Sequence, residues 1–157
     1  MQDSQIDRTD RKILAHLQRQ ARASNVELSE VVHLSAPQCY RRHRRLEELG
    51  LITGYEARLD PARLGFGVTA FINVTMERGH IRDLPKFKGV LASLPEILEC
   101  YAVTGDFDYM LKVIAYDLQS LSRFLMDTLM RLPGVTGVRS SVCLDEIKCT
   151  HALPLAE

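Results

Sequence analysis

The chain has 157 residues, of which 46% are hydrophobic and 25% are charged, and its 20 basic side chains equal its 20 acidic ones in number. This length and composition are typical of a folded globular protein with one domain or two small ones, which excludes a largely disordered chain. The apolar runs are far shorter than the roughly 18 residues of a membrane span, and the polar, acidic N-terminus does not resemble a signal peptide.

The first fifty residues predict three helices. Asp7 can cap the first helix, and apolar residues then recur at helical spacing. Asn25 can cap the second. Ser35 can cap the third, because Gln38 three residues later completes a capping-box pattern. Gly50 can end this third helix in a left-handed conformation.

The third helix concentrates positive charge. From Gln38 to Leu46 there are four arginines, one histidine and no acidic residue, although the whole chain is neutral. An exposed charged face is the usual explanation of such a run, but surface helices normally mix both signs. Two short helices, a tight turn and a cationic third helix form a helix-turn-helix, which predicts DNA binding. His43 lies on the inward face and is expected to be half-buried with a hydrogen-bond partner.

In a helix-turn-helix the first residues of the third helix reach the base edges. Here these residues are Ala36, Pro37, Gln38 and Arg41. Glutamine can pair with adenine and arginine with guanine, while alanine or proline can contact a thymine methyl group. The arginines further along the helix are expected to hold phosphates, namely Arg42, Arg44 and Arg45.

A boundary between two domains is predicted near residue 60. Residues 51–59 look extended, and Gly54 offers a turn, so a small hairpin or wing is expected there. Asp60-Pro61 and the nearby glycines are typical of a linker. The first domain is therefore a winged helix-turn-helix over 1–60, and the second domain covers 61–157.

The second domain alternates strands and helices in the order βαββαβ. Strands are predicted over 68–77, 97–104, 107–116 and 135–149, and helices over 81–94 and 117–132. This order is typical of a ferredoxin-like sandwich with an antiparallel sheet, which makes the whole chain α+β. Helices should cover one face of the sheet, with Leu118 among the inward residues. The other face, where Phe71 points, should be apolar and predicts a sheet-to-sheet homodimer.

Residues 105–109, Gly-Asp-Phe-Asp-Tyr, have two interpretations. Gly105 and Asp106 are good turn residues and can simply join the second and third strands by a tight turn. Alternatively, a carboxylate at Asp106 or Asp108 can attract the ammonium group of a ligand, whose own carboxylate would meet the turn amides. Composition alone favours the simple turn.

The chain shows no set of catalytic or metal-binding residues. Its four cysteines form no CxxC pair and have no metal-like spacing with the histidines. Cys39, Cys100 and Cys143 lie in apolar patterns, where a free cysteine behaves as a small buried hydrophobic residue. We expect a reduced, cytoplasmic protein that is not an enzyme and has no cofactor, metal or membrane partner.

These features together resemble the leucine-responsive regulatory protein/AsnC (Lrp/AsnC) family of prokaryotic transcription regulators. The similar segments cover nearly the whole chain and are residues 6–22, 45–55, 59–65, 103–111, 132–135 and 140–155. Cys39 and His43 depart from the family pattern, which usually has aliphatic residues there.

The resemblance implies that the chain binds a double-stranded DNA operator and responds to an amino acid. It also implies homodimers, often assembled into octamers of four dimers, with the effector at the junction between dimers. Carried over by position, the effector site comprises Tyr101, Val103, Gly105, Asp106, Asp108, Thr136, Arg139, Ser140 and Ser141. An apolar pocket for the side chain favours a branched-chain or sulfur-containing amino acid.

Two other functions stay open at this point. An architectural DNA-binding oligomer would bind DNA equally with or without an amino acid. A ferredoxin-like small-molecule module or enzyme with an incidental basic helix would have no affinity for DNA.

Overall fold

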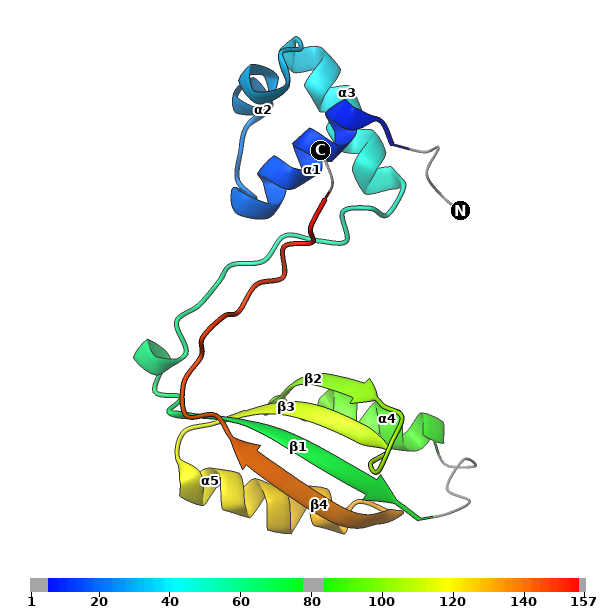
Figure 1. Ribbon diagram of the computed structural model, residues 1–157, viewed down its shortest axis with the longest axis vertical. Coiled ribbons are helices and arrows are strands. Elements are labelled where there is room, and N and C mark those ends of the chain that lie inside the picture. Colours follow the sequence, from blue (N-terminus) through cyan, green and yellow to red (C-terminus); the bar gives the residue numbers. More distant parts are fainter. Residues whose placement is uncertain (1–5, 78–83, 156–157) are drawn as a thin grey trace. The chain divides into compact units, whose positions relative to one another are not determined.

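Residues 6–77 and 84–155 are described by the structure, a computed structural model (Figure 1). The chain divides into a helical unit, formed by residues 1–58 together with 148–157, and a sheet unit formed by residues 59–147. The chain therefore returns to the helical unit after it has completed the sheet.

The helical unit consists of α1 (Arg8–Arg19), α2 (Asn25–Val32) and α3 (Ala36–Glu48). Asp7 caps α1 as predicted, and its carboxylate accepts a 2.8 Å hydrogen bond from the Asp10 amide. The cap of α2 is Ser24 rather than Asn25, because only Ser24 has a partner three residues later, Glu27, whose carboxylate accepts from the Ser24 amide. Gly50 follows α3 with a φ of 69°, a left-handed conformation that glycine adopts without steric cost.

The core of the helical unit draws on all three helices. It contains Ile13, Leu17, Leu28, Cys39 and Leu46, all buried. Cys39 thus behaves as the predicted small hydrophobic residue. Since Cys39 and Leu46 anchor α3 by one face, its opposite face is left toward solvent.

The sheet unit has the predicted βαββαβ order. Its elements are β1 (Val68–Met76), α4 (Leu84–Ser93), β2 (Ile97–Ala102), β3 (Tyr109–Ala115), α5 (Leu118–Arg123) and β4 (Val135–Val142). The strands form one antiparallel sheet in the order β2-β3-β1-β4. A short 3₁₀ helix, Ala62–Leu64, precedes β1, and the predicted helix residues 81–83 lie outside the described residues.

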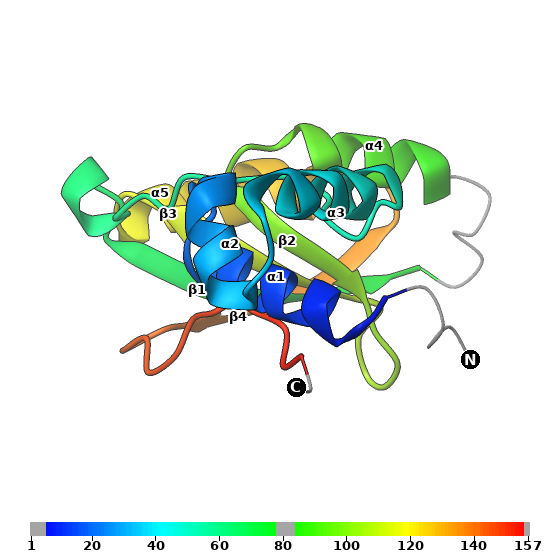
Figure 2. The ribbon, with the colours of Figure 1, turned by 90° about the horizontal axis from the view of Figure 1, so that it is seen from above.

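One face of the sheet carries the core. Alternate residues of β1 and β3 are buried there against α4 and α5, which lie on the same side of the sheet (Figures 1 and 2). Leu118, predicted to face inward, is 62% exposed. Leu118 is the first residue of α5, three residues before the buried Leu121, and the helix changes to a wider turn only after it, at Phe124–Thr128, and to a tighter one at Leu129–Arg131.

The opposite face of the sheet is mixed rather than apolar, which corrects the prediction. Phe71 is 39% exposed on this face. Lys112, opposite Phe71 on β3, forms a 3.3 Å ion pair with Glu99 of β2. Cys100 is exposed and not buried as expected, because β2 is an edge strand of the sheet.

Three predicted boundaries need correction. The hairpin or wing over 51–59 is not formed, because the Leu51 and Ile52 amides both donate to the Leu46 carbonyl, at 3.1 and 3.3 Å, and fold back on α3. β4 ends at Val142 instead of residue 149, since its last pair is Ala70–Val142 and only Val68 and Thr69 of β1 lie beyond it, where the Cys143 amide donates to the Thr69 carbonyl at 2.8 Å. The connection between β2 and β3 is the loop 103–108 rather than a tight two-residue turn.

No helix in the described ranges 6–77 and 84–155 has the length and apolar character that crossing a membrane requires.

Candidate nucleic-acid interface and ligand site

The exposed side of α3 begins with the residues predicted to reach bases. Pro37, Gln38 and Arg41 are exposed, and Ala36 is half-buried. The Gln38 side-chain oxygen accepts hydrogen bonds from the Ser35 amide and hydroxyl, at 3.1 and 3.0 Å. A two-point contact of Gln38 with adenine therefore requires that this cap open, because such a contact uses the same oxygen.

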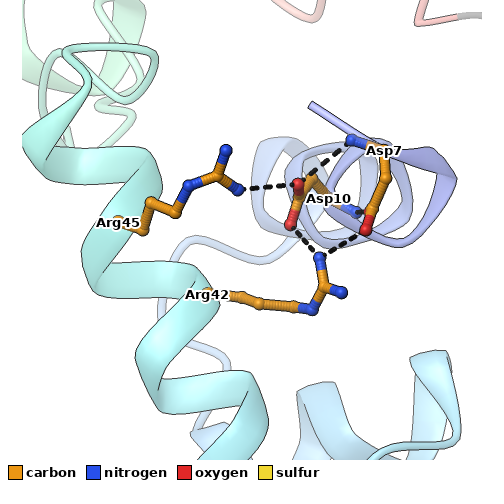
Figure 3. Close-up of polar contacts among 4 residues, drawn as sticks. All are labelled: Asp7, Asp10, Arg42 and Arg45. Atoms are coloured by element: carbon orange, nitrogen blue, oxygen red, sulfur yellow. Dashed lines mark hydrogen bonds and ion pairs between the residues drawn. The ribbon is translucent and has the colours of Figure 1, made fainter. Parts of the chain in front are cut away.

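The arginines of α3 are not free of acidic neighbours. Arg42 Nη1 lies 2.7 Å from Asp7 Oδ2 and 2.8 Å from Asp10 Oδ1, and Arg45 Nη1 lies 3.3 Å from Asp10 Oδ2 (Figure 3). Both carboxylates come from the start of α1, and Asp10 is only 1% exposed. Two of the four arginine charges are thus paired with carboxylates at the start of α1.

The titration of this cluster follows its geometry. The hydrogen bond from the Asp10 amide lowers the pKa of Asp7, and the Arg42 guanidinium adds to this effect. The carboxylates of Asp10 and Asp7 in turn raise the pKa of Arg42. The ion pairs with Asp7 and Asp10 connect Arg42 to α1, which explains its position better than a phosphate contact does.

The other two arginines of α3 are Arg41 and Arg44. Arg44 forms a 3.2 Å ion pair with Glu47 one turn along the same helix, and 57% of its side chain is exposed. An open hollow of about 400 Å³ is lined by Asp7, Leu34, Gln38, Arg41, Arg42 and Arg45. It brings predicted base-reading and phosphate-binding residues together on one side of the unit.

A second polar cluster joins α3 to the segment that follows it. The Tyr55 hydroxyl lies 2.5 Å from His43 Nε2 and donates a 3.0 Å hydrogen bond to Glu47. Burial, together with Glu47, raises the pKa of Tyr55 to about 12. His43 is half-buried and has a hydrogen-bond partner, as predicted. The sequence did not identify that partner as Tyr55, and it did not identify Asp7 and Asp10 as partners of the arginines.

In the sheet unit, several predicted ligand-site residues meet at the end of β1. The Asp108 carboxylate accepts a 2.6 Å hydrogen bond from the Met76 amide. The Thr136 hydroxyl donates to the Thr75 carbonyl at 3.2 Å. The Arg139 guanidinium lies 5.3 Å from the ring centre of Phe107. The loop 103–108 and β4 are therefore held together. Phe107 contributes the ring that contacts Arg139, and the prediction did not include it.

Within the loop, Asp106 and Asp108 differ. Gly105 has a φ of 118°, which side-chain-bearing residues rarely adopt, and Asp106 beside it is exposed. Asp108 is bound to β1 twice, since its amide also donates to the Val74 carbonyl at 3.0 Å. Both side chains are exposed, and they differ in that the Asp108 carboxylate is bound to the Met76 amide and holds the loop in place.

The remaining predicted residues are more dispersed. Tyr101 lies on β2, separated from β4 by β3 and β1, and its hydroxyl donates to Glu99 at 2.8 Å. Val103 donates its amide to the Asp108 carbonyl at 3.0 Å. Ser140 and Ser141 are exposed on β4, opposite Ile72 and Phe71. Within the described part of the chain, no group of three or more His, Cys, Asp or Glu residues is arranged to hold a metal ion.

The two units match two family models. The model of the AsnC-type helix-turn-helix domain matches residues 6–47, and that of the Lrp/AsnC ligand binding domain matches residues 69–153. The leucine-responsive regulatory proteins of Escherichia coli (strain K12) and Salmonella typhimurium are each 43% identical over 148 residues, which is 94% of this chain and 90% of theirs.

Solved structures are similar over almost the full length. A transcriptional regulator of Neisseria meningitidis in complex with L-Met has a TM-score of 0.92 and 41% identity, over 96% of this chain and 97% of that one. An AsnC family transcriptional regulator of Agrobacterium tumefaciens has a TM-score of 0.90 and 34% identity, over the same shares.

Proposed function

The chain belongs to the Lrp/AsnC family of transcription regulators, and on this basis we propose that α3 recognises an operator while the sheet unit senses an amino acid. The helix-turn-helix is its DNA-binding domain. Since its relatives regulate transcription, the chain is a regulator and not an enzyme. We assign DNA recognition to residues 1–60 and both sensing and assembly to residues 61–157, with the protein acting in the cytoplasm.

The observation that carries DNA recognition is the exposed, cationic start of α3 beside the hollow. Arg41 is exposed and lines this hollow, where it is suited to a guanine edge. Pro37 and Ala36 lie at the N-terminus of the same helix and suit thymine methyl groups. Arg44 and Arg45, further along, suit phosphates, and Gln38 contributes to base contacts if its cap with Ser35 opens.

The effector proposal rests on the loop 103–108 and on the names of the relatives. The loop displays Asp106 and the backbone at Gly105 next to β4, where an α-ammonium and an α-carboxylate can both find partners. Relatives are named leucine-responsive, and one was solved with L-Met. We therefore favour L-leucine or L-methionine as the effector.

Assembly follows from the sheet. Only one face of the sheet carries helices among the described residues, and Phe71 is exposed on the other. We propose a homodimer through this face and an octamer of four dimers, with the effector between dimers. Arg139, Ser140 and Ser141 would line the effector site together with residues of the loop.

One experiment tests the function. The protein is used to select duplexes from a random pool, and affinity for the selected duplex is then measured with and without L-leucine or L-methionine. Preferential binding that changes with an amino acid is expected, because an effector acts only through unequal affinity for two states. Preferential binding that no amino acid changes would instead indicate an architectural protein, and no DNA binding would refute the proposal.

A further inference from the structure

Among the residues that the structure describes, Asp10 is the one charged side chain that is buried, with 1% of its surface exposed. A carboxylate without water is costly unless charged donors surround it. Its Oδ1 accepts from Arg42 Nη1 at 2.8 Å. Its Oδ2 accepts from Arg45 Nη1 at 3.3 Å and from the Asp7 amide at 3.1 Å. The hydrogen bonds from two arginines of α3 therefore offset the cost of burying the Asp10 carboxylate.

The two arginines leave α3 three residues apart and converge on this single carboxylate of α1 (Figure 3). Charge-assisted hydrogen bonds to two oxygens of one group fix direction as well as distance. A rotation of α3 about its axis would break at least one of these bonds. The same rotation would move Arg41 and Gln38, which line the hollow beside the cluster.

We propose that Asp10 is a positioning residue for DNA recognition, which sets the rotation of α3 and the direction of the Arg45 guanidinium through its bonds to Arg42 and Arg45. This inference rests on the proposed DNA-binding role of α3. Asp10 itself, being buried, touches no DNA.

The arrangement has an unusual consequence for affinity. The negative charge of Asp10 also offsets part of the positive charge of Arg42 and Arg45, and Arg42 has a second ion pair with Asp7. Without this charge, α3 loses its fixed orientation while the surface becomes more positive. Binding to the selected sequence should then weaken, while binding to random DNA should strengthen. If Asp10 only stabilised the fold, its loss would weaken binding to the selected sequence and to random DNA alike.

The test compares the parent with Asp10→Asn, which keeps the shape and removes the charge, and with Glu48→Gln as a matched loss of an exposed acid on α3. Affinities for the selected duplex and for a random-sequence duplex are measured across a salt series, after circular dichroism has confirmed folding. For Asp10→Asn, the ratio of selected to random affinity should fall about tenfold or more. The salt slope on random DNA should become steeper by about one.

Glu48→Gln should leave the affinity ratio near that of the parent. If Asp10→Asn keeps the parental ratio and slope, or lowers both affinities equally while folded, the proposal is overturned.

A second comparison covers the case in which Asp10→Asn does not fold. Arg42→Gln should lower the ratio, because Arg42 holds α3 to α1, whereas Arg44→Gln should weaken both duplexes alike. An equal loss on both duplexes for Arg42→Gln would also overturn the proposal. Where Asp10→Asn folds, adding it to Arg42→Gln should change the ratio less than it does in the parent. A parent without any sequence preference would instead refute the proposed function.

Discussion

The hydroxyl of Tyr55 lies 2.5 Å from Nε2 of His43. The family resemblance predicts an aliphatic residue at position 43. Because this hydroxyl donates its proton to Glu47 at 3.0 Å, its oxygen is the acceptor for the His43 ring nitrogen. His43 and Glu47 both belong to α3. The chain after α3 therefore stays attached to the recognition helix at least as far as Tyr55, in place of the predicted wing.

The first prediction concerns this attachment. Tyr55→Phe removes both hydrogen bonds and should lower the free energy of unfolding by about 1 kcal/mol at neutral pH. The neutral phenol, whose pKa is raised from 10 to about 12, contributes stability that is fully present below pH 10 and is lost as the pH rises toward 12. Urea denaturation between pH 7 and pH 11.5 checks this. The difference between variant and parent should shrink above pH 10, and a constant difference would contradict the assigned partners.

The second prediction separates base contacts from phosphate contacts on α3. Arg41→Ala should cost roughly 1–3 kcal/mol on the selected duplex and relax preference at one base position. Arg44→Ala should weaken all duplexes alike and reduce the salt slope by about one, because one phosphate contact is lost. Binding titrations at matched salt measure both. Parental affinity in both variants would show that another face of the unit meets DNA.

The third prediction separates the two aspartates of the loop 103–108. Asp106→Ala should weaken amino-acid binding about tenfold or more and leave stability unchanged, because this side chain is exposed. Asp108→Ala should destabilise the sheet unit by roughly 1–3 kcal/mol, since the Met76 amide loses its partner. Calorimetry with L-leucine and L-methionine, together with thermal unfolding, distinguishes the two. Equal affinity in the parent and Asp106→Ala would exclude this carboxylate.

The fourth prediction concerns assembly. Phe71→Glu places a charge on the sheet face that carries no helix and should shift the protein from dimer toward monomer in light scattering. Leu118→Glu is the matched control, because Leu118, the first residue of α5, is 62% exposed. It should leave the mass unchanged. A monomeric parent would refute the proposed assembly, and an effect of Leu118→Glu alone would place the interface elsewhere.

The fifth prediction concerns acid. The lowered pKa of Asp7 means that its carboxylate contributes stability above its ordinary value near 3.8, which is lost as the pH falls through the lower folded value. Asp7→Asn keeps an N-cap but removes the charge, so it should flatten the decline in stability below pH 4. Asp145→Asn, which removes an exposed carboxylate, should leave this decline as it is in the parent. Urea denaturation from pH 2 to pH 6 compares the three proteins.

Much of the fold could be predicted because it depends on local patterns. Asp7 and Ser35 have the spacing of caps, and alternate apolar residues of β1 define a covered face. Two boundaries that failed depend on backbone partners. The Leu46 carbonyl takes the amides of Leu51 and Ile52, and the last pair of β4 with β1 is Ala70–Val142, two residues from the start of β1.

For the site, the sequence by itself determined that α3 would be cationic and exposed, and that a glycine-aspartate loop would precede β3. It did not reveal that Asp7 and Asp10, 35 and 32 residues before Arg42, neutralise part of that charge. Nor did it show that the exposed Asp108 carboxylate is bound to the Met76 amide and holds the loop 103–108 to β1. Helical spacing records which residues share a face of one element. The pairing of charges and hydrogen bonds between elements exists only once the chain has brought them within a few ångströms, and the tertiary structure alone decides it.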